Sequence, residues 1–433
     1  MAKHTYILGG GMTGIAAGFA SGLPVLEAAE SPGGICSSYY VRPREKERLP
    51  CSPKDGNAYR FEIGGGHWIF GGDPVVLRFI RNLTPVKSYS RKSSVYFREQ
   101  DLYVPYPLQN HLRYLSKEVA GNALVEMAKP DGPRTTMKQW LETNFGPTLC
   151  RLFFYPFHEL YTAGMQEVIA PQDAYKSPVS LPVAIQGAFR SPDAVGYNIQ
   201  YLYPEDGLDT LARRMADRCN ISFGKRVERI DVNRKKLVFG DGSQSDYDSL
   251  LSTLPLNKMM EMTELNVEAK PDPHTSVLVL NIGAIRGPKC PDDHWLYNPD
   301  AESKFHRVGF YSNVDRSFLP LKAREQGDRV SIYVEKGYPG GARPGEEETR
   351  AYANAVIEEL QSWDFIGEVE VVDPTWIDVA YTWSWPGSEW KNRALPLLEN
   401  HDIFQIGRYA RWNFQGISDS IKDGFYAGCS FAS

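Results

Sequence analysis

The sequence predicts an α/β fold in which a nucleotide-binding domain is interrupted by further segments. Three observations support this prediction. A strand, a glycine-rich turn and a helix follow one another at the start of the chain; strand-like runs at 276–285 and 329–335 belong to another sheet; and no Pro/Ser-rich linker divides the chain. At 433 residues the chain exceeds the usual size of one domain, so we expect further domains built from insertions.

Each element follows from the periodicity of the apolar residues. The predicted elements are strands at 4–8 and 24–27 with a helix at 14–20 between them, and helices at 136–164, 208–215 and 347–363. Three strand-like runs come after residue 220: ISFGKRVERIDV, KLVFGDGSQ and YDSLLSTLP. An Asp-Gly pair between Phe239 and Ser243 indicates a hairpin turn within these runs.

Composition and charge favour a protein whose partner is a small molecule. The chain carries 42% hydrophobic and 23% charged residues, has a net charge of −5, and disperses its 48 Lys and Arg. These features argue against nucleic acid and against an anionic membrane surface as partners. Six scattered cysteines without a Cys-x-x-Cys pair predict reduced thiols and no metal site. Because there is no signal-peptide segment or apolar run of about 18 residues, we expect a cytoplasmic protein, either monomer or oligomer.

The first motif with chemical meaning is a phosphate-binding turn. The turn consists of Gly9, Gly11, Met12, Thr13 and Gly14, in a G-x-G-x-x-G pattern between a predicted strand and a predicted helix. Glycines let the backbone approach a pyrophosphate, and the free amides at the start of the helix bind its charge. Glu27, at the end of the second strand, can accept hydrogen bonds from a ribose. The motif predicts a Rossmann-like dinucleotide site.

The residues after Glu27 select the dinucleotide. The stretch LEAAESPGGICSSY, which contains Gly33 and Gly34, resembles the FAD-binding signature of the amine-oxidase and protoporphyrinogen-oxidase superfamily. In that superfamily the paired glycines let the chain pass close to the flavin. The stretches VERID, which would place the backbone of Val227 against the adenine, and DGLDTLARRMA extend the resemblance. The resemblance implies FAD as the cofactor.

A narrower resemblance begins at FEIGGGHWIF, residues 61–70. Gly65 and Gly66 indicate backbone close to a flat surface, and His67 follows directly. The GGH-x-IF pattern resembles the flavin-facing loop of eukaryotic-type UDP-galactopyranose mutases, in which the histidine approaches the reactive edge of the isoalloxazine. From the residues alone, a glycine-rich loop with a partly buried histidine is the other interpretation.

Three further stretches resemble segments of the same mutases, in the same order. LYVPYPLQN (102–110) contains Gln109, residues 285–314 contain Arg286 and Tyr297, and LENHDIFQIGRYARWNFQGISDSIKDG (398–424) contains Arg408. The resemblance covers nearly all of the chain and is loose over 136–200. It implies an FAD-binding domain of the amine-oxidase/UDP-galactopyranose mutase type with inserted helical and antiparallel-sheet substrate domains. The expected boundaries are 1–75, 202–265 and 395–433 for the discontinuous FAD-binding domain, 76–201 for the mainly helical insertion, and 266–394 for the antiparallel sheet.

The resemblance also implies an activity, that of an FAD-dependent mutase of a nucleotide-diphosphate sugar. In that family the N5 atom of reduced flavin attacks the anomeric carbon, the diphosphate departs, and the sugar ring opens and recloses. An external reductant must first reduce the flavin. Arg286 and Arg408 match arginines that would bind the diphosphate, and with His67 they are the predicted catalytic residues.

Further site residues follow from the matched segments. The predicted substrate-binding residues are Gln109, Lys176, Tyr297, Trp385 and Phe414. The predicted cofactor contacts near the C-terminus are Gly407, Arg408, Ser418, Asp419 and Ser420. Asp419 and Ser420 are equally candidates for a helix N-cap, and Arg411 receives no role.

Two departures from the mutases bear on the substrate. Where the mutases carry tyrosines, this chain has Phe414 and, before Pro386, Trp385. Each lost hydroxyl donor would weaken diphosphate binding by roughly 1 to 3 kcal/mol in a buried site. The nucleobase and the sugar of the substrate therefore stay open.

Two other functions stay open at this point. One is an FAD-dependent oxidoreductase of the amine oxidase, protoporphyrinogen oxidase or desaturase type, and the other is a flavin-binding scaffold without catalysis. Paired arginines suit an anionic substrate, whereas an amine site would use an aromatic cage or acidic residues.

Overall fold

The structure is a computed structural model of the chain and describes residues 4–172, 178–190 and 199–432. A parallel five-stranded sheet lies at its centre, in the order β10-β2-β1-β14-β20. Its strands are β1 (Thr5–Leu8), β2 (Val25–Leu26), β10 (Ile221–Ser222), β14 (Ser249–Ser252) and β20 (Ile403–Gln405). Most of their residues are buried, as expected of a parallel sheet covered on both faces. These five strands come from three separate parts of the sequence.

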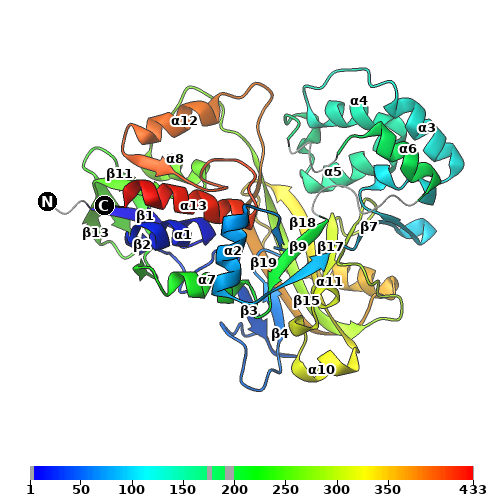
Figure 1. Ribbon diagram of the computed structural model, residues 1–433, viewed down its shortest axis with the longest axis horizontal. Helices are drawn as coiled ribbons and strands as arrows, with labels where there is room; N and C mark the ends of the chain where they lie inside the picture. Colours follow the sequence, from blue (N-terminus) through cyan, green and yellow to red (C-terminus); the bar gives the residue numbers. More distant parts are fainter. Residues whose placement is uncertain (1–3, 173–177, 191–198, 433) are drawn as a thin grey trace.

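Four helices cover one face of this sheet, and two of them, α1 and α13, pack unusually closely. The four are α1 (Met12–Ser21), α2 (Pro74–Leu83), α7 (Leu208–Ala216) and α13 (Ile417–Phe431). Figure 1 shows α13, from the C-terminus, alongside α1. Glycine makes this possible, because a Cβ at Gly424 would lie 2.2 Å from the Thr13 carbonyl oxygen, and one at Gly428 would lie 2.5 Å from that of Ala17. The two ends of the chain therefore form one layer.

The other face carries two helices and a small antiparallel sheet. The elements are α8 (Leu256–Thr263), α12 (Trp390–Glu399), β11 (Val227–Asp231), β12 (Lys236–Phe239) and β13 (Gln244–Asp246). The run 221–232, predicted as one strand, is divided between β10 and β11. The turn between them contains Gly224 at φ 66°, and the two strands belong to different sheets. The predicted hairpin between Phe239 and Ser243 is present, with the Phe239 amide donating to the Ser243 carbonyl.

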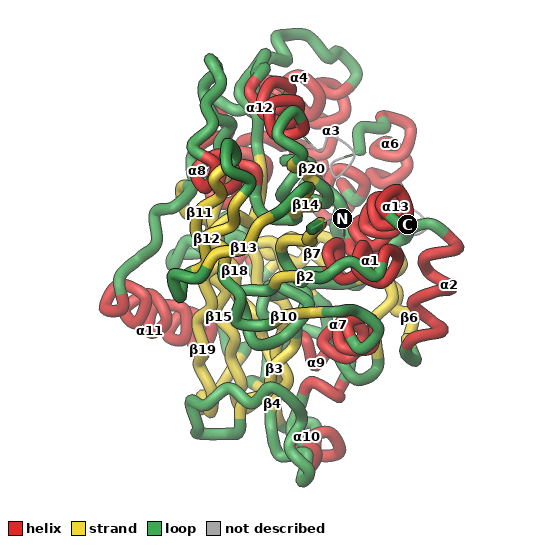
Figure 2. The backbone as a smooth tube through the Cα atoms, turned by 90° about the vertical axis from the view of Figure 1, so that its left-hand side faces the viewer, coloured by secondary structure: helices red, strands yellow, loops and turns green. Residues whose placement is uncertain are grey.

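A second, larger sheet has seven strands in the order β19-β15-β18-β17-β16-β7-β8. Their bounds are β7 (Ser93–Phe97), β8 (Leu102–Pro105), β15 (His274–Arg286), β16 (Trp295–Tyr297), β17 (Arg307–Phe310), β18 (Arg329–Pro339) and β19 (Ile366–Thr382). Every pair is antiparallel except β16 with β7. Helix α11 (Glu346–Ser362) covers one face beside β15 and β19, as Figure 2 shows. The other face of the sheet packs into a core that it shares with α1, β3 and β4.

A separate lobe of helices stands at the upper right of Figure 1. It contains α3 (Lys117–Met127), α4 (Met137–Leu149), α5 (Tyr155–Tyr161) and α6 (Leu181–Phe189). Its α-helices begin only at residue 117, because β7 and β8 from the expected insertion at 76–201 join the seven-stranded sheet. The helix predicted over 136–164 is interrupted at Gly146 (φ 75°), just before Pro147, and continues through a π-helical turn at Cys150–Phe154.

The remaining elements connect these layers. They are β3 (Ser38–Val41) with β4 (Tyr59–Glu62), the sheet β5 (Ile69–Phe70), β9 (Gln200–Pro204) and β6 (Val86–Ser90), and the short helices α9 (Tyr311–Val314) and α10 (Leu321–Gln326). Among the described helices, none combines the length and apolar character needed to span a bilayer.

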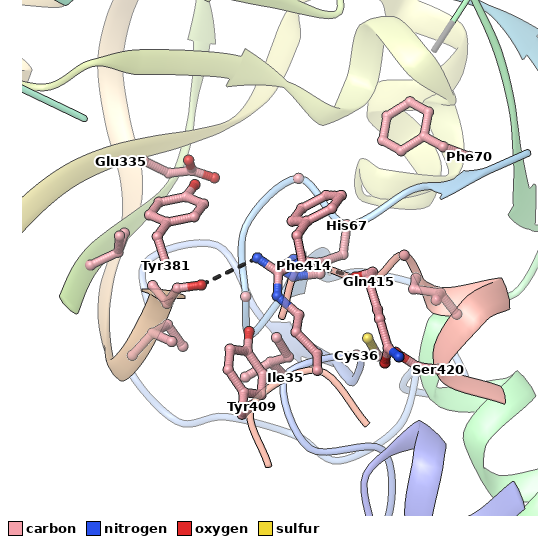
Figure 3. A pocket seen from close by; sticks show the side chains of 18 of the residues that line it. Ile35, Cys36, His67, Phe70, Glu335, Tyr381, Tyr409, Phe414, Gln415 and Ser420 are labelled. Carbon is pink, nitrogen blue, oxygen red and sulfur yellow. Dashed lines mark hydrogen bonds between the residues drawn. The ribbon is translucent and has the colours of Figure 1, made fainter. Parts of the chain in front are cut away.

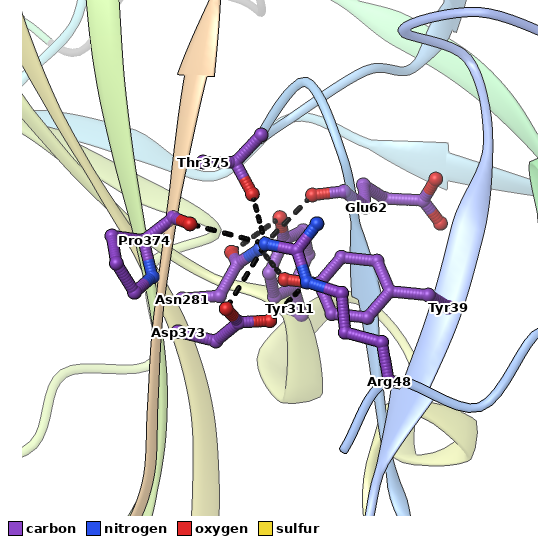
Figure 4. A network of polar contacts seen from close by, with 8 residues as sticks. All are labelled: Tyr39, Arg48, Glu62, Asn281, Tyr311, Asp373, Pro374 and Thr375. Carbon is purple, nitrogen blue, oxygen red and sulfur yellow. Dashed lines mark hydrogen bonds and ion pairs between the residues drawn. The ribbon is translucent and has the colours of Figure 1, made fainter. Parts of the chain in front are cut away.

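A polar network fixes β3 and β4 against the large sheet (Figure 4). Arg48 binds both carboxylate oxygens of Asp373 at 2.7 and 3.0 Å, and its guanidinium lies 4.4 Å from the ring centre of Tyr39. The Asn281 amide, on β15, donates to the Tyr39 hydroxyl at 2.9 Å and to the Glu62 carbonyl at 3.0 Å. This holds the end of β4, from which the glycine-rich loop at 63–67 departs.

Glu62 itself is fully buried beneath that loop. Its carboxyl accepts hydrogen bonds from Ser38 at 2.8 Å and from the Tyr203 hydroxyl. Burial raises the pKa of Glu62 to about 8, because desolvation outweighs the hydrogen bonds and the charge of Arg60. The folded protein therefore holds a proton here at pH values where the unfolded chain has released it.

We expect Glu62→Gln to flatten the pH dependence of stability between pH 4.5 and 8. The wild-type group binds more protons when folded, so its contribution is complete below its unfolded pKa and is lost as pH rises through the folded pKa. The rise of the pKa from 4.5 to about 8 corresponds to about 5 kcal/mol at most. Urea unfolding from pH 5 to 8 measures the slope, with the exposed Glu47→Gln as control. An unchanged slope in Glu62→Gln would contradict the assignment.

Candidate functional site

A cavity of about 480 Å³ lies where the parallel sheet, the large sheet and the helical lobe meet. Figure 3 shows its central part, with Glu335 and Tyr381 on one side and Cys36, Gln415 and Ser420 on the other. His67 and Phe414 lie between these two groups. The cavity is therefore built from segments that are far apart in the sequence.

The glycine-rich turn after β1 forms one end of the cavity. Gly9, Gly11, Met12 and Thr13 line it, while Gly14 lies behind them. A Cβ at Gly14 would stand 1.9 Å from the Gly9 carbonyl oxygen, so only glycine allows α1 to begin so close to β1. A Cβ at Gly11 would meet no protein atom within 4 Å. Gly11 is the N-cap of α1 and has no side chain to occupy the first amides.

The predicted ribose and adenine contacts are neighbours beside this turn. Glu27 accepts from the amides of Gly10 and Ala29, and its own carbonyl accepts from the Lys225 amide at 2.8 Å. Val227 begins β11 two residues later. The structure brings Glu27 and Val227 together beside the glycine turn, but neither lines the 480 Å³ cavity.

The second glycine pair passes directly along the cavity. Gly33 (φ 107°) and Gly34 (φ 58°) both line it, in backbone conformations that side chains rarely adopt. The Gly33 amide donates to the Gly10 carbonyl at 2.8 Å. This bond ties the two glycine turns together.

The loop after β4 is pressed against the large sheet. A Cβ at Gly66 would lie 2.1 Å from the Tyr333 hydroxyl, and one at Gly65 would lie 2.7 Å from a carboxylate oxygen of Glu335. Gly66 and His67 line the cavity, whereas Gly65 lies behind them. Burial, followed by the charge of nearby Arg408, lowers the pKa of His67 to about 4. His67 is therefore neutral at physiological pH, and its buried Nδ1 has no hydrogen-bond partner among the described residues.

The C-terminal segment supplies an arginine to the cavity. The Arg408 guanidinium lies 4.5 Å from the ring centre of Phe414 and donates to the carbonyls of Ala380 (3.3 Å) and Gln415 (3.2 Å). Gly407, at φ 85°, also lines the cavity, as do Phe414 and Ser420.

Arg411, to which the sequence analysis assigned no role, supports the backbone of the Gly407–Arg408 turn. It pairs with Asp423 at 3.3 Å, and Asp423 accepts the Gly407 amide at 2.6 Å. Arg411 also donates to the Gln405 carbonyl at 3.1 Å. Asp423 thereby fixes the backbone from which Arg408 projects.

Helix α13 begins one turn earlier than an N-cap at Asp419 or Ser420 would require. Its N-cap is Gly416, and Asp419 accepts the Gly416 amide at 3.2 Å from the third helical position. Ser420 lines the cavity from the first turn, whereas Ser418 lies outside the lining with its buried hydroxyl unpartnered among the described residues. The N-cap of α13 is therefore Gly416, and neither Asp419 nor Ser420 occupies that position.

The structure does not bring Arg286 to the cavity. It is the last residue of β15, and its guanidinium donates to Asn313, to the carbonyls of Cys290 and Pro291, and to Asp292. The strand ends before its side chain can reach the cavity. Arg286 therefore stabilises the turn that follows β15.

One arginine that the sequence analysis missed is Arg307, on β17. Two of its nitrogens bind Glu335 at 2.9 and 2.7 Å, and both side chains line the cavity. Burial alone would raise the pKa of Glu335, but the charge of Arg307 and the contact with His306 hold it at about 2. Arg307 lies within the resembling segment 285–314, in the stretch FHRVGFYSN.

The four other predicted substrate residues lie as follows. Tyr297 lines the cavity and packs against Tyr106, with ring centres 4.5 Å apart and ring planes tilted by 46°. Trp385 lies outside the cavity lining, and its indole N–H donates to the Pro271 carbonyl. Gln109 is buried away from the cavity and donates to the Pro178 carbonyl, and Lys176 falls outside the described residues.

Tyr381 and Trp383 occupy the wall where Trp385 was expected. Tyr381 contacts Tyr161 of the helical lobe, with ring centres 4.6 Å apart, and the Trp383 indole donates to Thr275 at 2.7 Å. Both residues belong to the same YTWSWP stretch as Trp385.

Comparison with known proteins agrees with this geometry. The family model described as flavin-containing amine oxidoreductase matches residues 23–280, more than half of the chain. The chain belongs to this family. Its cofactor is FAD, and it is a flavoenzyme of the amine oxidase superfamily. The FAD cofactor that the resemblance to the amine-oxidase superfamily implied is thereby confirmed.

Solved structures share the fold over nearly the whole chain. A crystal structure of reduced UDP-galactopyranose mutase matches with a TM-score of 0.81 and 20% identity, covering 99% of this chain and 95% of that one. A fatty acid isomerase from P. acnes matches with a TM-score of 0.59 and 14% identity, covering 99% and 97%. Putrescine oxidase bound to putrescine matches with a TM-score of 0.54 and 16% identity, covering 99% and 98%. The predicted fold class and the mutase-like architecture are confirmed.

The residues present fit FAD. Open space beside Gly11 and the positive φ angles of Gly33 and Gly34 leave a channel along the glycine-rich turns. Within residues 4–172, 178–190 and 199–432, no group of three or more His, Cys, Asp or Glu could hold a metal ion.

We expect Gly11→Ala to fold normally and to lose FAD. The new Cβ meets no protein atom within 4 Å, so any loss of affinity must come from contact with the cofactor. A tenfold or greater increase in the FAD dissociation constant is expected, which is about 1.4 kcal/mol or more. The ratio of absorbance at 450 to 280 nm and an FAD titration of the apoprotein measure it.

Gly345→Ala is a matched control for this substitution. Gly345 is also a helix N-cap with nearly the same backbone angles (φ −68°, ψ 169° against φ −71°, ψ 178° at Gly11), and a Cβ there is likewise unobstructed. Equal FAD affinity in Gly11→Ala and Gly345→Ala would contradict the placement of the cofactor at this turn.

Proposed function

We propose that this chain is an FAD-dependent mutase that isomerises the ring of a nucleotide-diphosphate sugar. The observation that supports it best is the charge of the cavity. The described lining residues include three arginines (Arg91, Arg307 and Arg408) and one carboxylate, that of Glu335. A cationic surplus beside the flavin loops suits a substrate with a diphosphate, because planar guanidinium groups match phosphate oxygens in pairs.

The two cations nearest the flavin loops are held in different ways. Arg307 is fixed by Glu335, which lies against the loop at Gly65. Arg408 is fixed by carbonyls and by the ring of Phe414. Preformed donors of this kind stabilise a departing diphosphate without having to reorganise during the reaction.

Reduced FAD, when bound, supplies a nucleophile, N5, for the anomeric carbon of the sugar. The chain's own residues hold the sugar and exclude water. The neutral His67 ring offers a hydrogen-bonding nitrogen without adding charge, and Tyr297, Tyr381 and Trp383 form apolar walls. An external reductant must keep the flavin reduced.

The alternative is an oxidoreductase of the amine oxidase type, which the family description favours. A cationic amine needs an acidic partner or an aromatic cage. Glu335, the single carboxylate among the described lining residues, is already bound to Arg307. The aromatic walls remain the feature that would suit an amine or an apolar chain.

The two functions separate in one experiment. Protein reduced with dithionite is offered UDP-, dTDP-, GDP- and ADP-linked hexopyranoses, and the products are separated by anion-exchange chromatography. We expect a ring-isomerised sugar nucleotide from reduced protein and none from oxidised protein. Peroxide release from an amine by the oxidised protein, with no isomerised product, would support the oxidoreductase and overturn the mutase.

We expect Arg307→Lys to weaken binding of the active nucleoside diphosphate roughly tenfold to a hundredfold. Lysine keeps the charge beside Glu335 but loses the planar pair of donors, at a cost of about 1.5 to 3 kcal/mol. Isothermal titration measures the affinity. Arg286→Lys is the control and should bind like the wild type, since its guanidinium lies outside the cavity. A larger loss in Arg286→Lys than in Arg307→Lys would refute the placement of the diphosphate.

A further inference from the structure

We propose that His306 is a positioning residue for the proposed reaction: it takes up a proton when an anionic substrate binds Arg307, and it then holds Glu335 together with that arginine. The inference rests on the proposed function, because the anion it requires is the diphosphate of the substrate. It adds to that function a proton-linked step in binding, which the arginines by themselves would not produce.

His306 is enclosed beside the carboxylate of Glu335. Its side chain is 2% exposed and lines the cavity, and its Nε2 lies 3.4 Å from Oε2 of Glu335. The backbone fixes this approach, because the His306 amide donates to the Glu335 carbonyl at 3.0 Å and the next residue, Arg307, is paired with Glu335 across β17 and β18. The imidazole and the guanidinium therefore lie against the same carboxylate.

The contact between imidazole and carboxylate is incomplete. Although Nε2 lies 3.4 Å from Glu335, neither ring nitrogen of His306 has a hydrogen-bond partner in the part of the chain that the structure describes. Arg307 already binds both carboxylate oxygens, at 2.9 and 2.7 Å. Two buried ring nitrogens without partners are unfavourable, so any change that lets the ring donate to Glu335 is favoured.

The rings packed around His306 are aromatic. Tyr161 and Phe157 of α5 have ring centres 5.5 and 6.1 Å from that of His306, and Tyr381 of β19 has its ring centre at 6.4 Å. Burial raises the pKa of Tyr381, so its hydroxyl keeps its proton. Figure 3 shows Tyr381 on the same side of the cavity as Glu335. These elements enclose the imidazole in a medium that strengthens the effect of nearby charges.

Of the described charged groups, Glu335 and Arg307 act on the imidazole in opposite directions. Burial lowers the pKa of His306 below its ordinary value; the contact with Glu335 opposes this shift, and the charge of Arg307 adds to it. A diphosphate bound at Arg307 cancels much of the field of the guanidinium. The imidazole can then accept a proton from solvent, and Nε2–H donates to the carboxylate, which can only accept.

The added proton changes how Glu335 is held. Without it, the carboxylate and the diphosphate compete for the same planar donors of Arg307. With an imidazolium beside it, Glu335 keeps a charged partner while the guanidinium donates to phosphate oxygens. His306 therefore acts through Glu335 and Arg307 and needs no contact with the substrate.

The experiment measures proton uptake during binding by titration calorimetry of the FAD-loaded protein. The ligands are UDP-, dTDP-, GDP- and ADP-glucose, because a diphosphate esterified at both ends has no group of its own that titrates near neutral pH. Each titration is run in PIPES and in imidazole buffer, which differ in their heat of ionisation, from pH 6 to 8.5. The variant is His306→Gln, which cannot take up the proton.

His158→Gln is the matched control. His158 is a buried histidine that lines the same cavity, but its Nδ1 faces the carbonyl of Phe154, at 2.7 Å, and not a carboxylate. Proton uptake in His158→Gln should equal that of the wild type.

We expect the wild type to take up as much as one proton and to bind the nucleotide sugar roughly tenfold more weakly at pH 8.5 than at pH 6. A rise of one pKa unit on binding corresponds to about a tenfold change in affinity, which is lost as pH rises through the pKa of the complex. His306→Gln should take up no proton and bind with an affinity that does not depend on pH. A residue that only filled space would leave the pH dependence unchanged.

A second measurement needs no functional variant. In protein with ¹³C-labelled histidine rings, the His306 resonance is identified by its absence from His306→Gln. It should titrate at a higher pH with bound nucleotide sugar, and in sulfate compared with chloride at equal ionic strength. Sulfate stays a dianion throughout this pH range, so its effect does not depend on the identity of the substrate.

Each contrary result has its own meaning. If a nucleotide sugar binds without proton uptake, or if the uptake persists in His306→Gln or is lost in His158→Gln, the inference is wrong while the proposed function stands. If none of the nucleotide sugars binds, the proposed function fails and the sulfate titration decides: a raised His306 titration supports the link between anion and proton, and an unchanged one overturns it. Circular dichroism checks that both variants are folded.

Discussion

The structure depends on backbone segments that approach one another too closely for side chains. A Cβ at Gly14 would lie 1.9 Å from the Gly9 carbonyl, one at Gly424 would lie 2.2 Å from that of Thr13, and one at Gly66 would lie 2.1 Å from the Tyr333 hydroxyl. These contacts bring the first helix, the last helix and the large sheet to one cavity. Because glycine alone fits there, the cofactor channel and the packing of the domain have the same origin.

Electrostatics then divides the cavity. In the Arg307–Glu335 pair the carboxylate is buried and the arginine side chain is 21% exposed. The pair places one cation and the single carboxylate of the described lining next to the loop that carries His67. Arg408 enters from the C-terminal turn, against the face of Phe414. Phe414 has no hydroxyl to donate, but its ring supports the guanidinium. The helical lobe adds no charged side chain to the described lining.

The sequence analysis found lining residues correctly where a short motif specifies them. The G-x-G-x-x-G turn, the pair Gly33–Gly34 and the Gly407–Arg408 turn all line the cavity or support it. It was wrong where the direction of a side chain decides whether the residue lines the cavity. Arg286 and Arg307 lie in the same resembling segment, but Arg286 ends its strand outside the cavity, whereas Arg307 stands opposite Glu335 on a neighbouring strand. In the same way Trp383 lines the cavity, whereas Trp385, two residues later, lies outside the lining with its indole bonded to the Pro271 carbonyl.

The sequence by itself determined the glycine turns of the predicted cofactor motifs and the class of fold, because glycine conformations, helix starts and strand spacing are local properties of the chain. Only the tertiary structure decided which arginines line the cavity and how its aromatic walls are formed. Strand register and the packing of the helical lobe set those directions, and they depend on contacts between residues far apart in sequence. His158 illustrates this: its segment reads as an apolar helix, and only the packing of the lobe brings its side chain to the cavity.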